Sequence, residues 1–279
     1  MTETVRDVKQ HFWSNRIIPF LTIRTTYNSC QSYKSHSHSE LSLGIIESGV
    51  TQLSMPGEKF ILEKGDMILI EPDMVHACNP LRAMPRSYHM LYIDNAWCCD
   101  VLSKLYGYQA TKYRCDLNLL PNVASDINFS DLIHLLLTSA TRDLALEVEQ
   151  YLFDLVSLYC SPYHEYETES DLACQLRHRL LQDIATAPSL ESVAQEFARS
   201  KETLIRLFKK RFGITPRSFL NNSRVEKAKM LLKRGVSIVD VASDVGFSDQ
   251  SQFHRTFVNY TASTPRQYQQ VTSIFDNKS

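Results

Sequence analysis

Residues 239–257 read VDVASDVGFSDQSQFHRTF, and this pattern predicts two short helices joined by a tight turn. Apolar residues recur at helical spacing up to Val245, and again at Phe253 and Phe257. Between the two stretches, Gly246 suits the left-handed backbone conformation of such a turn. The outer face of the second helix carries polar side chains: Gln250, Ser251, His254 and Arg255.

The same pattern occurs once more upstream. The string IRLFKKRFGITPRSF (205–219) aligns with HRTFVNYTASTPRQY (254–268) at an offset of 49 residues, and each copy ends in Thr-Pro-Arg before an aromatic residue. Before these strings the offset is 48, and the one-residue difference falls in the turn, where length changes are tolerated. The repeat predicts two helix–turn–helix units, at about 190–212 and about 238–260.

The first unit predicts a basic outer face on its second helix. Ser200 has the side chain of an N-cap, and Leu204 and Phe208 point toward the core. The outward positions are Lys201, Glu202, Ile205, Arg206, Lys209 and Lys210. The N-terminal half of such a recognition helix enters the major groove of DNA, where an arginine can donate two hydrogen bonds to guanine.

The segment between the units and the charge balance also fit double-stranded DNA. Residues 216–233 begin with proline and predict one helix, about 27 Å long, which could hold two recognition helices near one DNA turn apart. Residues 172–279 carry 17 Lys and Arg against 9 Asp and Glu, a balance of +8, whereas residues 1–171 carry −9. A basic module joined to an acidic one is typical of a polyanion-binding domain attached to a second function.

The segment 190–268 resembles the DNA-binding domain of AraC/XylS-type transcriptional regulators, most specifically at 239–257 and at TPRQY (264–268). This resemblance implies a sequence-specific regulator, more often an activator, that is not an enzyme. Carried over by position, it implies base contacts from Glu202, Ile205, Arg206, Gln250, Ser251 and Arg255. Ala262 stands where the family commonly has glycine, so we expect the second recognition helix to end differently from the first, which keeps Gly213.

The N-terminal residues predict a different architecture. Short apolar stretches separated by turn signals fill residues 17–93, as in a small barrel or sandwich, and helical periodicity begins near Asn95. The predicted fold is therefore multi-domain, β followed by all-α. We expect an effector-binding and dimerisation domain with a cupin-like β-barrel and following helices at 1–160, a polar linker at 161–171, and the DNA-binding domain at 172–279.

Two strings in the N-terminal region, HSHSE (36–40) and GDMILIEPDMVHACNP (65–80), resemble the two motifs of cupin barrels, which family members often carry as effector domains. Side chains alternate along a strand, so we expect the first string to present its polar residues on one face, close to a histidine of the second string. The predicted effector site consists of His36, His38, Glu40 and His76.

The same histidines leave a metal site open as an alternative. Three imidazoles from His36, His38 and His76 could hold Zn²⁺, Fe²⁺ or Mn²⁺, and Cys78 could add a thiolate. Glu40 follows His38 more closely than in metal-binding cupins, which favours hydrogen bonding to a small polar effector. A metal-responsive regulator and a metal-dependent cupin enzyme are the alternatives.

Three further features have open interpretations. The Cys98-Cys99 pair predicts either packing or a redox-sensing thiol pair, and the apolar stripe over 144–159 predicts either internal core or a homodimer face. Leu132, Leu135 and Leu136 share one face of a predicted helix. Seven irregularly spaced cysteines, a polar N-terminus and no long apolar run favour a reducing cytoplasm and no membrane partner. An activator of this kind would also contact RNA polymerase.

Overall fold

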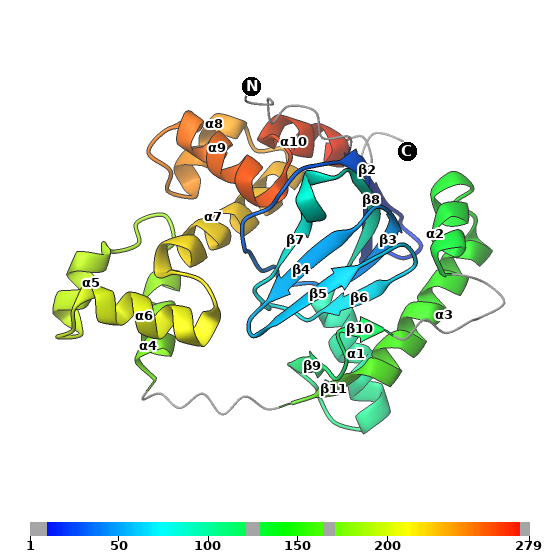
Figure 1. The fold of residues 1–279 in the computed structure, drawn as a ribbon, viewed down its shortest axis with the longest axis horizontal. Helices are drawn as coiled ribbons and strands as arrows, with labels where there is room; N and C mark the ends of the chain where they lie inside the picture. The colour runs from blue at the N-terminus through cyan, green and yellow to red at the C-terminus, as the bar shows by residue number, and fades with distance from the viewer. Residues whose placement is uncertain (1–9, 121–128, 164–170, 274–279) are drawn as a thin grey trace.

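The computed structural model describes residues 10–120, 129–163 and 171–273, which form a β-rich part and a helical part (Figure 1). The linker expected at 161–171 lies mostly outside the described residues. The strands are β1 Gln10–Ser14, β2 Leu21–Ser29, β3 Leu41–Ser48, β4 Thr51–Met55, β5 Glu58–Leu62, β6 Met67–Ile70, β7 Ala77–Pro80, β8 Arg86–Ile93, β9 Tyr113–Cys115, β10 Leu119–Leu120 and β11 Cys160–Pro162. The helices are η1 Leu81–Ala83, α1 Asn95–Tyr106, α2 Phe129–Thr138, α3 Arg142–Tyr159, α4 Leu172–Leu181, α5 Leu190–Glu196, α6 Lys201–Phe212, α7 Pro216–Lys233, α8 Ile238–Asp244, α9 Gln250–Thr261 and α10 Pro265–Ser273.

The β-rich part consists of two facing antiparallel sheets. One sheet has the strand order β1-β2-β8-β3-β6-β10 and the other has the order β5-β4-β7, while β9 pairs with β11 separately. Among the described residues, the sheets are not closed into a barrel by a continuous ladder, and an isolated bridge joins His36 to His76. The predicted β plus all-α architecture is confirmed, with an open barrel in place of a closed one.

Both faces of the larger sheet are covered, which explains why β3 is buried at six consecutive residues, 41–46. One face packs against the smaller sheet, through residues such as Leu53, Ile68 and Tyr88. The other face packs against α1, α2 and α3 (Figure 1). The apolar stripe over 144–159 belongs to this second core, so the internal-core interpretation of it is correct.

The helical part contains two separate cores, as the repeat predicts. Phe208 anchors the first core, around α4, α5 and α6, and Phe253 and Phe257 anchor the second, around α7 to α10. The connecting helix α7 has the predicted bounds and begins at Pro216. The predicted N-cap is also confirmed, because the Ser200 side chain accepts a hydrogen bond from the Thr203 backbone N–H.

Three local predictions are wrong. Ala262 ends α9 in the left-handed conformation (φ 55°), as Gly213 ends α6 (φ 77°), because the surrounding packing imposes that conformation on a non-glycine residue. Residues 36–40 are not a regular strand: they form a single β-bridge, from His36 to His76, and His38 accepts one further backbone hydrogen bond, from Asp73. Leu135 is 51% exposed, because the buried face of α2 is narrower than predicted and includes Leu132 and Leu136 but not Leu135.

Candidate DNA-binding surface and effector cavity

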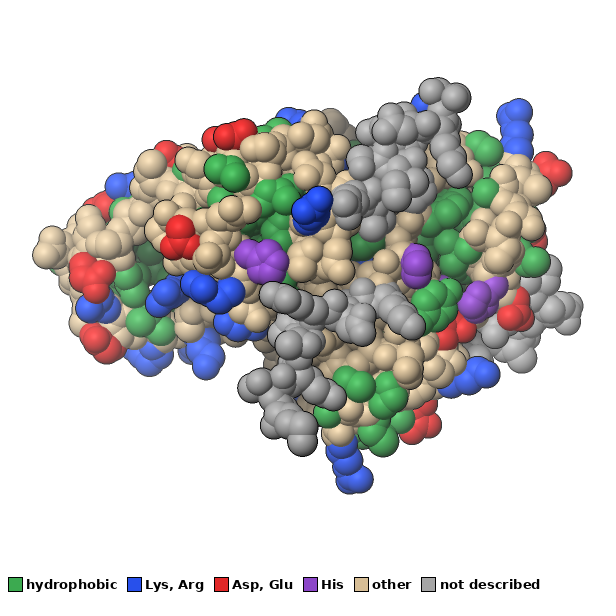
Figure 2. Space-filling view, turned by 90° about the horizontal axis from the view of Figure 1, so that it is seen from above, with side chains coloured by type: hydrophobic (Ala, Val, Ile, Leu, Met, Phe, Trp, Pro, Cys, Tyr) green, Lys and Arg blue, Asp and Glu red, His purple; other side chains and the backbone are tan. Residues whose placement is uncertain are grey.

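The second helix of each unit, α6 and α9, presents its outer face to solvent. Of the ten side chains predicted to contact DNA, Lys201 and Ile205 are half-buried. The exposed ones are Glu202, Arg206, Lys209, Lys210, Gln250, Ser251, His254 and Arg255. Lys and Arg side chains are visible over the helical part, on the left of Figure 2. Lys201 is already paired within the unit, since its Nζ lies 2.6 Å from Glu191 Oε1.

The histidine motif opens into a cavity of about 200 Å³ between the β-rich and helical parts. His36, His38 and Glu40 lie in its β-rich wall, whereas Lys229 and Lys233 of α7 lie in its helical wall. The rest of the lining is mostly aromatic or polar: Phe12, Pro19, Phe20, Thr22, Arg24, Tyr92, Asp94, Tyr260, Thr261 and Tyr268. A molecule in this cavity would therefore touch both parts of the chain.

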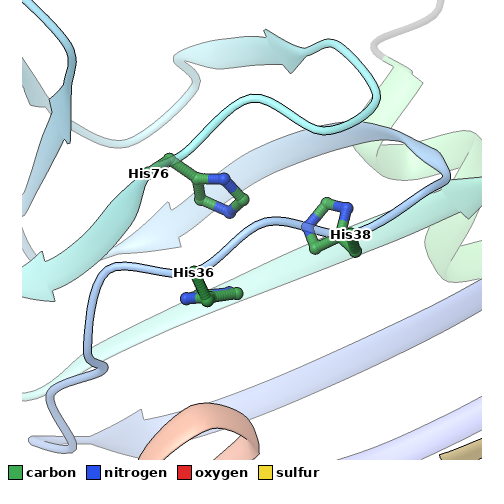
Figure 3. Close-up of side chains that lie close together, drawn as sticks. All are labelled: His36, His38 and His76. Carbon is green, nitrogen blue, oxygen red and sulfur yellow. The ribbon is translucent and has the colours of Figure 1, made fainter. Parts of the chain in front are cut away.

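His76 lies behind the cavity wall and completes a cluster of three imidazoles (Figure 3). Its ring centroid is 4.6 Å from that of His36 and 4.9 Å from that of His38. One nitrogen of each ring lies within 4.8 Å of the others. The structure thus brings together three of the four predicted effector residues, and Glu40 lines the same cavity outside this cluster.

Backbone carbonyls determine which ring nitrogens carry protons. Nδ1 of His36 lies 2.8 Å from the Lys34 carbonyl oxygen, and Nδ1 of His76 lies 2.9 Å from that of Met74. His38 Nδ1 makes a longer contact, 3.2 Å, with the Glu40 carbonyl oxygen. A carbonyl oxygen only accepts, so each Nδ1 carries the proton and each Nε2 of the neutral ring is an acceptor, which at His38 lies 3.4 Å from the Ser42 hydroxyl oxygen.

Burial keeps these imidazoles neutral. It lowers the pKa of His76 to about 4, and the positive charges of Arg24 and Lys229 act in the same direction. Burial and neighbouring His76 lower the pKa of His36 and of His38 well below the ordinary value. At neutral pH the cluster therefore offers hydrogen-bond acceptors without charge.

Specific contacts hold the two parts together around the cavity. Asn222 of α7 is buried and donates a hydrogen bond from Nδ2 to the Ser37 carbonyl oxygen at 2.8 Å. The Lys34 backbone N–H donates to the Asn259 carbonyl oxygen at 3.2 Å. Phe12 of β1 packs edge-on against Tyr268 of α10, with ring centroids 5.5 Å apart.

Comparison with protein families agrees with both parts of this architecture. Residues 22–156 match the family described as an AraC-like ligand binding domain, and residues 193–270 match a helix-turn-helix domain. Together the two matches span about three quarters of the chain. The chain is a transcriptional regulator of the AraC/XylS family. It combines an N-terminal ligand-binding domain with a C-terminal helix–turn–helix DNA-binding domain.

Curated relatives of the regulator span most of its length. It is 27% identical to the uncharacterized HTH-type transcriptional regulator YbfI of Bacillus subtilis, over 79% of this chain and 81% of that protein. It is 26% identical to the transcriptional activator RhaS of Escherichia fergusonii, over 86% and 88%. Among solved structures, ToxT from Vibrio cholerae shares the fold, with a TM-score of 0.54 and 15% identity over 91% of this chain and 98% of that one.

Sequence reasoning missed the cationic side chains of the regulator's cavity. Arg24 lies in β2, inside the stretch LTIRTT, where alternation predicts a solvent-facing arginine. The structure instead buries it among the rings of Tyr33, Tyr88 and Tyr92. Lys229 and Lys233 were missed because α7 faces the β-rich part on one side, which no local pattern reveals.

The histidine cluster fits a divalent metal in ligand type but not in charge. Nε2 acceptors with Nδ1 bonded to carbonyls are typical of metal-binding histidines. Arg24 and Lys229, however, place two positive charges near His76, and Glu40 is not part of the cluster. Burial raises the pKa of the Cys78 thiol to about 11, so in the metal-free protein this thiol is protonated at neutral pH.

The vicinal cysteines of α1 favour packing over redox chemistry. Both side chains are buried, and burial raises the pKa of Cys98 and of Cys99 above the ordinary thiol value. The thiolate is the reactive form, so these residues are poor redox sensors. Among the described helices, none is long and apolar enough to span a membrane.

Proposed function

We propose that the regulator activates transcription when a small molecule binds in the cavity between its two parts, against His36, His38 and Glu40, with His76 behind them. The observation that carries this proposal is the lining of the cavity, which includes side chains of the β-rich part and of the DNA-binding part. We place the effector and dimerisation domain at 1–160, the linker at 161–171 and the DNA-binding domain at 172–279.

The proposed mechanism is a population shift. Both walls of the cavity contact the bound molecule, so the molecule binds more tightly to one relative arrangement of the domains than to others. An effector with such a preference changes the populations by as much as its differential affinity. The DNA-binding helices α6 and α9 would then be held in a spacing that fits the operator.

In this proposal the side chains of the recognition helices have two roles, base recognition and phosphate binding. Arg206 and Arg255 are exposed at the middle of α6 and of α9 and would read base edges, whereas Lys209 and Lys210 would contact phosphates. The remaining predicted contacts are Lys201, Glu202, Ile205, Gln250, Ser251 and His254.

Selection from random oligonucleotides, with and without the small-molecule fraction of a cell extract, tests the DNA-binding proposal. Arg255→Ala should lower the ratio of specific to nonspecific affinity about tenfold or more, because one arginine–guanine pair is worth about 1–3 kcal/mol. Lys210→Ala, the matched control, should weaken binding to all sequences alike and flatten the salt dependence. Equal losses on both DNA types for Arg255→Ala would contradict the assignment.

A metal-responsive regulator is the second candidate, favoured by the close approach of one nitrogen each from His36, His38 and His76, within 4.8 Å of one another. Zn²⁺, Fe²⁺ or Mn²⁺ bound there would act as the effector, and the same DNA output would follow. Metal analysis of protein purified without an affinity tag tests this candidate. Stoichiometric metal that disappears in His76→Ala would favour it over the organic effector.

We further propose a cytoplasmic homodimer that contacts RNA polymerase and has no enzymatic activity. The exposed Leu146 and Leu158 of α3, 46% and 72% accessible, support a dimer face beside the internal stripe of that helix. Leu158→Glu should shift the mass measured by light scattering toward the monomer. A mass that stays monomeric at all concentrations in the wild type would exclude the dimer.

A further inference from the structure

Arg24 is a buried guanidinium that has no hydrogen-bond acceptor among the described residues. Its residue is 9% exposed, and its buried Nε has no hydrogen-bond partner. The guanidinium carbon lies 5.5 Å from the ring centroid of Tyr33, 5.8 Å from Tyr88 and 5.6 Å from Tyr92. Among the described residues, it has neither a hydrogen bond nor an ion pair, so three aromatic faces are its main stabilising neighbours.

Arg86, a second buried arginine of the same sheets, shows what a structural role requires. It is 1% exposed and also lies over Tyr88, at 5.0 Å. Its two terminal nitrogens donate hydrogen bonds to the carbonyl oxygens of Gln31 and Cys78, at 3.3 and 2.8 Å. Arg24 differs in that it lines the cavity between the domains, where a ligand can reach its donors.

The charged side chains in the cavity lining are Arg24, Lys229 and Lys233 against Glu40 and Asp94, three positive and two negative, a balance of +1. Lys229 forms an ion pair with Glu226, with Nζ 2.6 Å from Oε1. Asp94 caps α1 by accepting from two backbone N–H groups. Arg24 therefore has no ion-pair partner among the described residues, whereas the carboxylates of Glu40 and Glu226 act on Lys233. Lys233 of α7 is exposed and lines the same cavity as Arg24.

We propose that the effector is a small monocarboxylate, whose carboxylate binds Arg24 and Lys233 and so joins the two domains. A guanidinium presents paired donors that match a carboxylate. The aromatic rings of Phe12, Phe20 and Tyr268 would surround the hydrocarbon portion. A cavity of about 150 Å³ holds benzene, so 200 Å³ admits a ligand of about one ring or a short chain. This inference rests on the proposed effector role of the cavity.

Thermal melting of the full chain with matched acid and amide pairs tests the proposal. The pairs are hexanoate with hexanamide, phenylacetate with phenylacetamide, and cyclohexanecarboxylate with its amide, each at about 10 mM. At least one acid should raise the melting temperature by about 3 °C or more if its Kd is near millimolar, and its amide should not. Arg24→Gln should lose this shift, Lys233→Gln should reduce it, and Lys210→Gln, a matched change away from the cavity, should keep it.

Several outcomes would overturn the proposal. The proposal fails if no acid raises the melting temperature more than its amide does, if Arg24→Gln responds as the wild type does, or if inorganic phosphate gives the same shift as the acids. Arg24→Gln should itself fold, because it removes a desolvated charge that has no acceptor among the described residues, and Lys233→Gln changes only an exposed side chain. The two proposals can fail separately. If no acid raises the melting temperature but the wild type and both variants still select one DNA sequence, the carboxylate inference fails and the proposed DNA-binding role stands.

Discussion

Replacing Gly246 by alanine should destabilise the second helix–turn–helix unit far more than the same change at Gly235. Both glycines have a left-handed backbone, with φ of 84° and 78°. A Cβ at Gly235 meets no atom within 4 Å, so Gly235→Ala should cost only the backbone term, about 1–2 kcal/mol. A Cβ at Gly246 would lie 2.2 Å from the Ala185 carbonyl oxygen, which must move.

That carbonyl cannot move freely, because Arg224 donates hydrogen bonds to it at 3.3 Å and to the Ile184 carbonyl oxygen at 2.8 Å. Overpacking adds about 1–3 kcal/mol, so Gly246→Ala should lose roughly 2–5 kcal/mol in all. Urea titration of both variants followed by circular dichroism measures the difference, and operator affinity should fall in Gly246→Ala alone. Equal unfolding free energies for the two variants would refute this account of the turn.

Three further perturbations have predictable outcomes. Ala198→Gly should stabilise the first unit by about 0.5–1 kcal/mol in urea titration, because this exposed residue has a left-handed φ of 48°, and any loss would contradict it. Burial lowers the pKa of His76 and of His89 to about 4 in the folded protein, whereas the unfolded value is near 6.5. Because the unfolded state takes up protons first, the free energy of unfolding should decrease as pH falls from 6.5 toward 4. At pH 5.5 the unfolding free energy should drop by about 1.4 kcal/mol for each histidine, and a flat profile between pH 7.5 and 5.5 would exclude these shifts. Asn222→Ala should remove an interdomain hydrogen bond worth about 1 kcal/mol and accelerate amide exchange in residues 34–40 about fivefold, whereas the neighbouring Asn221→Ala should leave exchange unchanged.

Local rules predicted the helical part well because each of its features depends on neighbours in sequence. Apolar spacing located two cores, Pro216 began the connecting helix, and Gly246 took the left-handed turn. Ala262 shows where such rules fail, because packing can impose a glycine-like conformation on alanine. Leu135 fails for a related reason, since the width of a buried helix face depends on what packs against it.

The amino-acid sequence alone determined the duplicated DNA-binding architecture, the β-rich N-terminal region and the histidines that approach one another. Only the tertiary structure decided that Arg24 is buried and that α7 brings Lys233 to the lining of the same cavity. The physical reason is the range of the interactions. Helix periodicity, capping and turn conformation act over a few residues, whereas the environment of a charge depends on surfaces that lie about two hundred residues apart in the chain.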